Sequence, residues 1–316
     1  MNTGVKITAF AAALAVSFGT AYVAGQALGP VASPAEPASR GGHAADPSSD
    51  EGGRGEDAPA GGLQVSEGGY TLDLKTTKLE AGRRADLRFA IRDREGRKVT
   101  AFKREHDKEL HLILASRDLS TFRHLHPARA ADGTWSTSAE LPDAGDYRMF
   151  ADFTPAADGA ESLTLGTDLP VAGTYKPGAP AKPSRTAEVD GYTVSLDGRL
   201  RPGAAEEVTF EVTRKGRAVE DLQPYLGAYG HLVALRAGDL AYLHVHPNGR
   251  PGDRTTEPGP DVSFTATAPS EGTYRLFLDF KHEGKVRTAE FTVPAGPAGD
   301  APREPTGHEK SGSHQH

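Results

Sequence analysis

Histidine is the residue whose spacing first suggests chemistry in this chain. Two stretches, His111–Pro127 and His231–Pro247, align without a gap, so three histidines and a final proline keep their spacing in both. Neutral imidazoles that lie close together form a site for a divalent metal ion such as Cu(II) or Zn(II). The candidate ligands of the two repeats are His111, His124 and His126 in the first and His231, His244 and His246 in the second.

Each stretch has the pattern of a β-hairpin that would bring its three histidines together. Gly238-Asp239 suits a two-residue turn in the second repeat, and residues 117–120 suit a four-residue loop in the first. In this register the first histidine of each stretch lies opposite the last, with Cβ atoms about 4.5 to 5.5 Å apart. Because residues two apart share a face of a strand, the middle histidine points the same way. A register slip of one residue would send His231 to the other face.

The same face of each hairpin is apolar at its turn end and histidine-rich at its open end. This pattern predicts that the histidines lie at the rim of a sandwich core, partly desolvated and in need of partners. A metal ion would satisfy them. Hydrogen bonds to loop backbone would do so too, and a polar small ligand or a protein partner is the third interpretation.

Further ligands can be proposed from residues near the repeats. Asp152 and Asp279 occupy matching positions and would be either direct carboxylate ligands or partners that orient a ligand histidine. His106 and His282 are each present in one repeat only. If they contribute, the two sites differ in affinity or in metal.

Composition excludes several other functions. The net charge is −7 with no block of Lys or Arg, so a nucleic-acid partner is not expected. The chain contains no cysteine, which excludes disulfides, thiolate zinc sites and the cysteine-containing blue-copper site. No nucleophile elbow, phosphate-binding glycine loop or His-Glu-x-x-His helix is present, so we expect no enzyme. A three-histidine metal centre that activates water is the remaining catalytic hypothesis.

The chain is predicted to be exported. Residues 7–28 form an uncharged run long enough to cross a bilayer, so 1–30 is a signal-anchor or a cleaved signal peptide. We therefore expect a plasma-membrane protein with a single N-terminal span and its C-terminal domains outside, or else a secreted one. The remaining segments are a disordered stalk at 31–62, a first domain at 63–173, a Pro-rich linker at 174–185, a second domain at 186–294 and a disordered, histidine-containing tail at 295–316.

Both domains have the sequence pattern of an all-β sandwich. Short alternating runs are separated by Gly, Pro and Asp, and sustained helical spacing is nearly absent. Tyr147 and Tyr274 each follow a Gly-x pair and begin an apolar run, which is the tyrosine corner of immunoglobulin-like domains. The expected fold is two tandem immunoglobulin-like sandwiches after an N-terminal hydrophobic helix, with a cupredoxin-like topology as the alternative. Leu278 stands where a cupredoxin would need its copper cysteine, so a type 1 copper centre is excluded.

The repeated His-Leu, Asp-Leu and His-x-His-Pro pattern, with the Gly-x-Tyr-Arg-x-Phe strand, resembles a group of bacterial membrane-anchored or secreted proteins with tandem immunoglobulin-like repeats. The resemblance covers about two-thirds of the chain, from Leu63 to Val293. Proteins of this group are suspected of handling extracytoplasmic heavy metals, mainly copper. The resemblance thus implies copper as the metal, the six repeat histidines as its ligands and an extracytoplasmic copper-handling protein as a partner.

Two functions follow as hypotheses. The first is a non-enzymatic extracytoplasmic protein that binds Cu(II) or Zn(II) through its histidine clusters and buffers or passes the metal at the cell surface. The alternative is a structural or protein-interaction module of two β-sandwiches, in which the histidines only brace the loops. Chelator sensitivity of the folded protein separates the two.

Overall fold

The computed structural model describes residues 60–176 and 178–296, which form strands and loops with no helix among them. These residues lie within one compact unit, Arg54–His316. The predicted signal segment, the stalk up to residue 59 and the tail beyond residue 296 lie outside the described residues. In the described ranges no helix has the length and apolarity that a membrane span needs.

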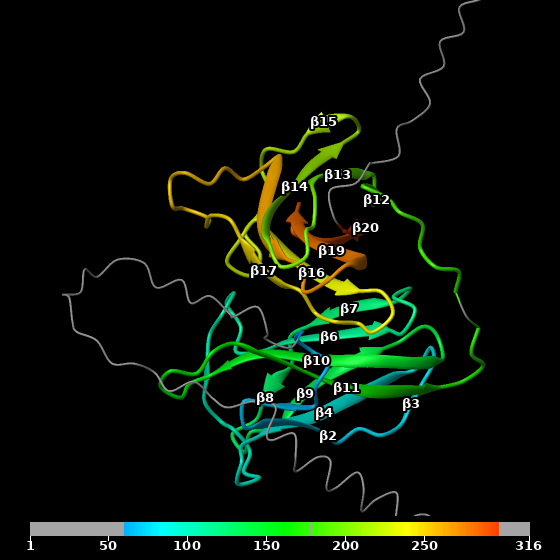
Figure 1. Cartoon of the computed structure of the whole chain (residues 1–316), viewed down its shortest axis with the longest axis vertical. Helices are drawn as coiled ribbons and strands as arrows, with labels where there is room; N and C mark the ends of the chain where they lie inside the picture. The colour runs from blue at the N-terminus through cyan, green and yellow to red at the C-terminus, as the bar shows by residue number, and fades with distance from the viewer. Residues whose placement is uncertain (1–59, 177, 297–316) are drawn as a thin grey trace, which may run out of the picture. The chain divides into compact units, whose positions relative to one another are not determined.

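The first sandwich consists of two sheets (Figure 1). One contains, in spatial order, β1 (Ser66–Glu67), β2 (Tyr70–Leu74), β4 (Arg84–Arg92), β9 (Trp135–Glu140) and β8 (Ala128–Arg129). The other contains β3 (Leu79–Glu80), β11 (Leu163–Ala172), β10 (Gly145–Pro155), β6 (His111–Ser116) and β7 (Phe122–Leu125), with β5 (Phe102–Lys103) beside β10. Trp135 stacks on Phe89 inside the core between these sheets.

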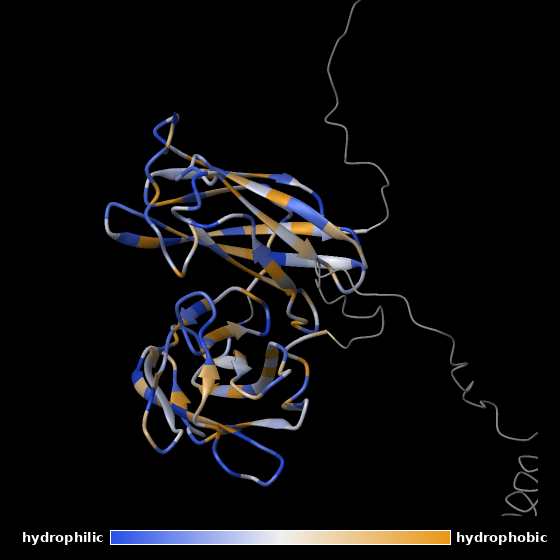
Figure 2. Cartoon of the chain, turned by 90° about the vertical axis from the view of Figure 1, so that its left-hand side faces the viewer, coloured by the Kyte–Doolittle hydropathy of each residue, from blue (hydrophilic) through white to orange (hydrophobic). Residues whose placement is uncertain are grey.

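The second sandwich repeats this arrangement with fewer strands in one sheet. One sheet contains β12 (Thr186–Val189), β13 (Tyr192–Gly198), β14 (Ala205–Arg214), β18 (Asp261–Thr267) and β17 (His244–Pro247), with β15 (Arg217–Ala218) beside β14. The other contains β16 (Gly230–Arg236), β19 (Gly272–His282) and β20 (Lys285–Ala295). Apolar and polar residues alternate along many strands (Figure 2), as expected for strands with one face in a core.

Both tyrosine corners are present. The Tyr147 hydroxyl donates to the carbonyl of Asp143 at 3.1 Å, and the Tyr274 hydroxyl donates to the carbonyl of Ser270 at 2.8 Å. Each tyrosine is buried, and its hydroxyl joins the strand to the preceding turn. The fold is therefore the predicted one, an all-β pair of tandem immunoglobulin-like sandwiches.

The hairpin of the first repeat has the predicted register. Ile113 pairs with His124 and Leu112 with Leu125, and the backbone of Ser116 bonds to Thr121 across the loop. His111 and His124 therefore lie on the same face, as the strand period requires. The side chain of Ile113 lies on this face as well.

The hairpin of the second repeat has the predicted register only at its turn. Leu235 pairs with Tyr242, but β17 then leaves β16 and pairs with β18 in the opposite sheet, so the prediction of one continuous hairpin is wrong. The apolar residues Leu243 and Val245 explain the departure, because both pack in the core of the second sandwich. Tyr242 instead donates its backbone N–H to the carbonyl of Gly61, a residue that the sequence assigns to the stalk.

The predicted position of the histidine face at the rim of each sandwich core is also wrong. The apolar parts of the two faces pack against each other and form a separate cluster between the sandwiches, in which the Phe122 and Phe277 rings stack with centroids 4.0 Å apart. The buried members of this cluster are Ile113, Ala115, Leu119, Phe122 and Phe150 from the first sandwich and Val233, Leu235, Leu240 and Phe277 from the second. The histidines consequently lie beside an interface that both repeats build.

Candidate metal centre

The histidines of the first repeat converge. His111, His124 and His126, here called the first-repeat trio, offer ligand atoms that all lie within 4.8 Å of one another. The ring centroids of His111 and His126 are 5.3 Å apart, and those of His124 and His126 are 4.7 Å apart. The strand register places the trio on one face, and the contact with the second sandwich encloses it.

The hydrogen bonds of His111 define where its protons lie. Its Nε2 is 3.2 Å from the Glu105 carbonyl oxygen, which can only accept, so Nε2 is the donor. In a neutral imidazole Nδ1 is then an acceptor, and it lies 3.1 Å from Nε2 of His124, which must donate. The space between these two ring nitrogens therefore holds a single proton.

Asp279 of the second sandwich completes this chain of hydrogen bonds. Its Oδ2 lies 2.8 Å from Nδ1 of His124, while its Oδ1 accepts a hydrogen bond from the Thr288 hydroxyl at 2.6 Å. The side chains of His124 and Asp279 are only 3% and 5% exposed. The sequence offers Asp279 as a direct ligand or as an orienting partner, and in the structure its carboxylate orients a histidine of the other repeat. A carboxylate in this position fixes the orientation of an imidazole and increases its basicity toward a metal.

His231 is the histidine through which the second sandwich packs on the trio. Its ring stacks on His124 at 4.6 Å and on His111 at 5.1 Å. Its Nδ1 is buried and has no hydrogen-bond partner among the described residues, and the same holds for Nε2 of His126. Two ring nitrogens in this cluster are thus available to a ligand that residues 60–176 and 178–296 do not supply.

Burial keeps several of these rings neutral. Desolvation, reinforced by His124 and other nearby histidines, lowers the pKa of His111 to about 3. Desolvation, with His124 and Lys108, lowers the pKa of His126 to about 3. The pKa of His231 is also lowered well below its ordinary value, mainly by burial. Neutral imidazole is the form that binds metal.

The other predicted ligands are distributed unevenly. His106 joins the cluster, since its ring lies 5.5 Å from His231 and 5.9 Å from His111. Asp152 pairs across the strands with His111, and its Oδ1 accepts from the Thr164 hydroxyl at 2.9 Å. Together with Asp279, Asp152 keeps the matching place that the repeat predicts.

Among the described side chains, His246 does not join His231 in a group of ligand atoms. His246 is exposed on β17, which belongs to the opposite sheet from β16. Of His244 the structure describes only the backbone, at the start of β17.

His282 has a structural role in the second sandwich. Its Nδ1 lies 2.6 Å from the Tyr192 hydroxyl and its Nε2 lies 2.9 Å from Oδ1 of Asp221. Since both ring nitrogens have protein partners, His282 is not available as a ligand in this arrangement.

Tyr225 is a member of the site that the sequence did not indicate. Its ring lies 6.2 Å from His126 in an edge-to-face contact, and burial together with the Asp279 carboxylate raises the pKa of Tyr225 to about 12. No histidine pattern marks this position. The backbone bridges Glu105–Lys108 and Tyr225–Ala228 occupy matching places in the repeats, so comparison of the two loops could have pointed to it.

The fold and the cluster together define an all-β protein of two immunoglobulin-like repeats that share one histidine cluster. Residues 64–176 and 187–296 each match the family described as "Domain of unknown function (DUF8832)". The chain belongs to this family and contains its domain twice. No curated protein matches the chain.

Several solved structures of bacterial surface proteins resemble the chain weakly. They include FdeC, an Escherichia coli adhesin, with 13% identity over 76% of this chain and a TM-score of 0.22. The Yersinia pseudotuberculosis adhesin InvE has 11% identity over 73% and a TM-score of 0.22, and InvD of the same organism has 13% identity over 77% and a TM-score of 0.24. The chain covers 66%, 60% and 62% of these structures, less than two thirds of each. At these TM-scores the resemblances say nothing about the function of the chain.

Proposed function

We propose that this chain is a non-enzymatic, extracytoplasmic metal-binding protein whose first-repeat trio holds a Cu(II) or Zn(II) ion, so that it buffers the metal or passes it on at the cell surface. The observation that supports this most strongly is the hydrogen bond between Nδ1 of His111 and Nε2 of His124. These nitrogens are 3.1 Å apart. Two imidazole ligands of a tetrahedral ion with metal–nitrogen bonds of about 2.0 to 2.1 Å are separated by about 3.3 Å.

A metal ion therefore fits where the proton now lies, after the rings separate by a few tenths of an ångström. Nε2 of His126, which is buried and has no hydrogen-bond partner within the described part of the chain, offers the third nitrogen. Asp279 would then hold His124 in the orientation typical of a carboxylate–histidine–metal unit. Uptake of the ion would release the proton of the His111–His124 hydrogen bond.

The donor atoms of the first-repeat trio determine which metal ions fit. The trio supplies nitrogen only, and the chain has no cysteine, a set that suits Cu(II) or Zn(II) better than Cu(I). The extracytoplasmic location rests on the apolar run at residues 7–28, which precedes both sandwiches.

The test is a Cu(II) or Zn(II) titration of the full chain in which the tail histidines His308, His314 and His316 are replaced by alanine. We expect His126→Ala to weaken the tight binding at least tenfold, by analogy with changes at metal sites. His246→Ala is the matched control, because His246 occupies the same repeat position and is exposed. A parent protein that binds nothing tighter than micromolar, or equal binding by both variants, would reject the proposal.

The second candidate is a structural or protein-interaction module, and the packed apolar cluster between the sandwiches favours it. That cluster, with the stacked Phe122 and Phe277, could hold the two sandwiches together without metal. In this case histidine variants lower the melting temperature, while chelator leaves the melting temperature of the parent unchanged.

A further inference from the structure

A second group of histidines lies next to the first-repeat trio and draws on both sandwiches. His106, His111 and His231, here called the bridging group, offer ligand atoms within 4.8 Å of one another. His106 and His111 come from the first sandwich, and His231 comes from β16 of the second. The repeats alone would not predict this group, because its members belong to different copies.

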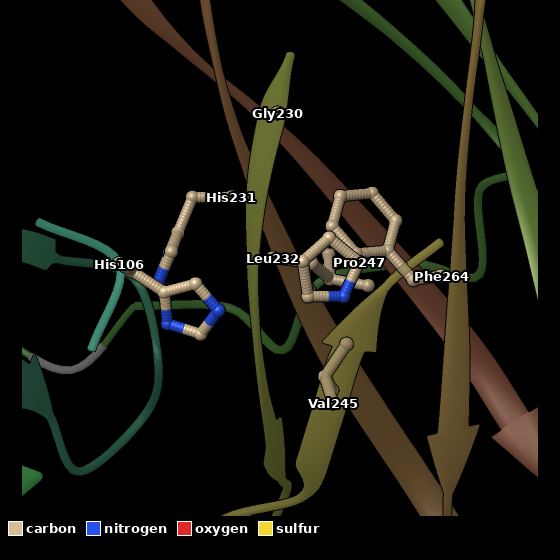
Figure 3. Close-up of a pocket in the computed structure, with 7 residues that line it drawn as sticks. All are labelled: His106, Gly230, His231, Leu232, Val245, Pro247 and Phe264. Carbon is tan, nitrogen blue, oxygen red and sulfur yellow. The ribbon is translucent and has the colours of Figure 1, made fainter. Parts of the chain in front are cut away.

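Two members of the bridging group, His106 and His231, border a small pocket. Figure 3 shows the side chains of His106 and His231 next to each other at one side of it, with Pro247 and Phe264 at the other. The pocket residues are His106, Gly230, His231, Leu232, Val245, Pro247 and Phe264. Nδ1 of His231 is buried and has no hydrogen-bond partner among the described residues, which is energetically unfavourable. A ligand that binds this nitrogen would remove the cost of leaving it unpaired.

His106 is held in place by an unusual backbone conformation that does not depend on histidine. Its φ is 48°, in the left-handed region, and Leu226 occupies the equivalent loop of the second repeat with a φ of 56°. The bridges Glu105–Lys108 and Tyr225–Ala228 close the two loops in the same way. The fold thus accepts leucine at this place, and the histidine at position 106 serves some purpose other than forming the loop.

The surrounding charges are mixed. The carboxylates of Glu105 and Asp107 favour a cation near His106, whereas the guanidinium of Arg250 opposes it. Binding at this place would depend on the nitrogen ligands, because the nearby charges largely offset one another.

We infer that His106, His111 and His231 form a second site for a divalent transition-metal ion, which joins the two sandwiches. The inference rests on the proposed function in one respect, since His111 is shared with the trio. Nδ1 of His111 faces His124, so Nε2, which now donates to the Glu105 carbonyl, is its ligand atom for the bridging group. An ion there replaces the proton on Nε2, and that proton passes to solvent.

The experiment is calorimetric titration with Zn(II) of the full chain, again with the tail histidines replaced by alanine. The parent is expected to bind two equivalents, and His106→Leu one. Because Leu226 already adopts this conformation in the second repeat, His106→Leu should fold, and near-UV circular dichroism checks that it does. His126→Ala should still bind the Zn(II) ion at the bridging group, which His106→Leu does not bind.

The possible outcomes separate the two claims. If the parent binds Zn(II) and His106→Leu binds the same number of equivalents with the same affinity, the bridging group is not a site, although the trio can still be one. A parent that binds only one equivalent, which His106→Leu retains and His126→Ala loses, also overturns the inference. If the parent binds neither Zn(II) nor, in a parallel titration, Cu(II), the proposed function fails as well.

Discussion

The hydrogen bond between His124 and Asp279 should stabilise the fold strongly, and its removal gives the sharpest prediction. Asp279→Ala leaves Nδ1 of His124 and the Thr288 hydroxyl without their acceptor in a place where the two side chains of the pair are 3% and 5% exposed. Each buried donor that is left without an acceptor costs about 1 to 3 kcal/mol, so the two together cost about 2 to 6 kcal/mol. We therefore expect Asp279→Ala to lower the free energy of unfolding by about that amount.

Urea denaturation at neutral pH with chelator present measures this loss without any contribution from metal. Asp168→Ala is the matched control, because the Asp168 side chain is 78% exposed although it pairs with Arg148 at 2.8 Å. Although the Arg148 side chain is only 11% exposed, the Asp168 carboxylate lies largely in solvent, so we expect its loss to cost about 1 kcal/mol or less. A double-mutant cycle with His124→Ala should give a coupling energy of about 1.5 kcal/mol or more.

The reasoning is refuted if Asp279→Ala costs no more than Asp168→Ala. It is also refuted if the two substitutions at His124 and Asp279 are additive, because the contact would then make no specific contribution.

The remaining predictions concern the interface and the response to acid. Phe277→Ala removes a buried ring stacked 4.0 Å from Phe122, so it should cost about 3 to 5 kcal/mol and separate the calorimetric unfolding of the sandwiches into two transitions; a single unshifted transition would contradict this. The pKa of His111 and of His126 is lowered from the ordinary 6.5 to about 3, so the unfolded chain binds more protons between these values. With chelator present, the free energy of unfolding should be highest above pH 6.5 and should fall as the pH decreases toward 3. His111 alone should contribute a decrease of at most about 1.4 kcal/mol per pH unit. A melting temperature that does not change from pH 7 to pH 4.5 would show that these rings are not buried as neutral groups.

Much of the fold could be predicted because local patterns determine it. The gapless repeat and the strand period give the register of β6 and β7, and the Gly-x-Tyr pattern gives both tyrosine corners. These features depend on residues close together in the chain. The convergence of the first-repeat trio follows from the same local rules.

The arrangement across the interface could not be predicted in the same way. The two-residue period of a β-strand shows which side chains lie on the same face. It does not show whether that face packs in its own sandwich or against another domain. One signal was present in the sequence: the apolar residues of the run His111–Ser116 do not alternate with polar ones, and the structure buries all of its positions. An uninterrupted apolar strand indicates that both faces are covered.

The second repeat shows why an identical motif need not give an identical site. Leu243 and Val245 are drawn into the core of the second sandwich, which takes β17 to the opposite sheet and leaves His246 exposed. The difference between His106 and Leu226 in the equivalent loops adds to this asymmetry. The path of β17 depends on tertiary packing, so the spacing of the histidines could not reveal it, whereas the absence of a histidine at position 226 is visible in the sequence.

The most direct test of the metal site is to count protons while the metal binds. Calorimetric titration of the His106→Leu chain with Zn(II), in buffers of different ionisation enthalpy, measures both the affinity and the protons released. If an ion replaces the proton between His111 and His124, tight binding is accompanied by proton release, and His126→Ala in the same background loses both. Binding without proton release, or binding that persists unchanged in that variant, would contradict a metal centre at the first-repeat trio.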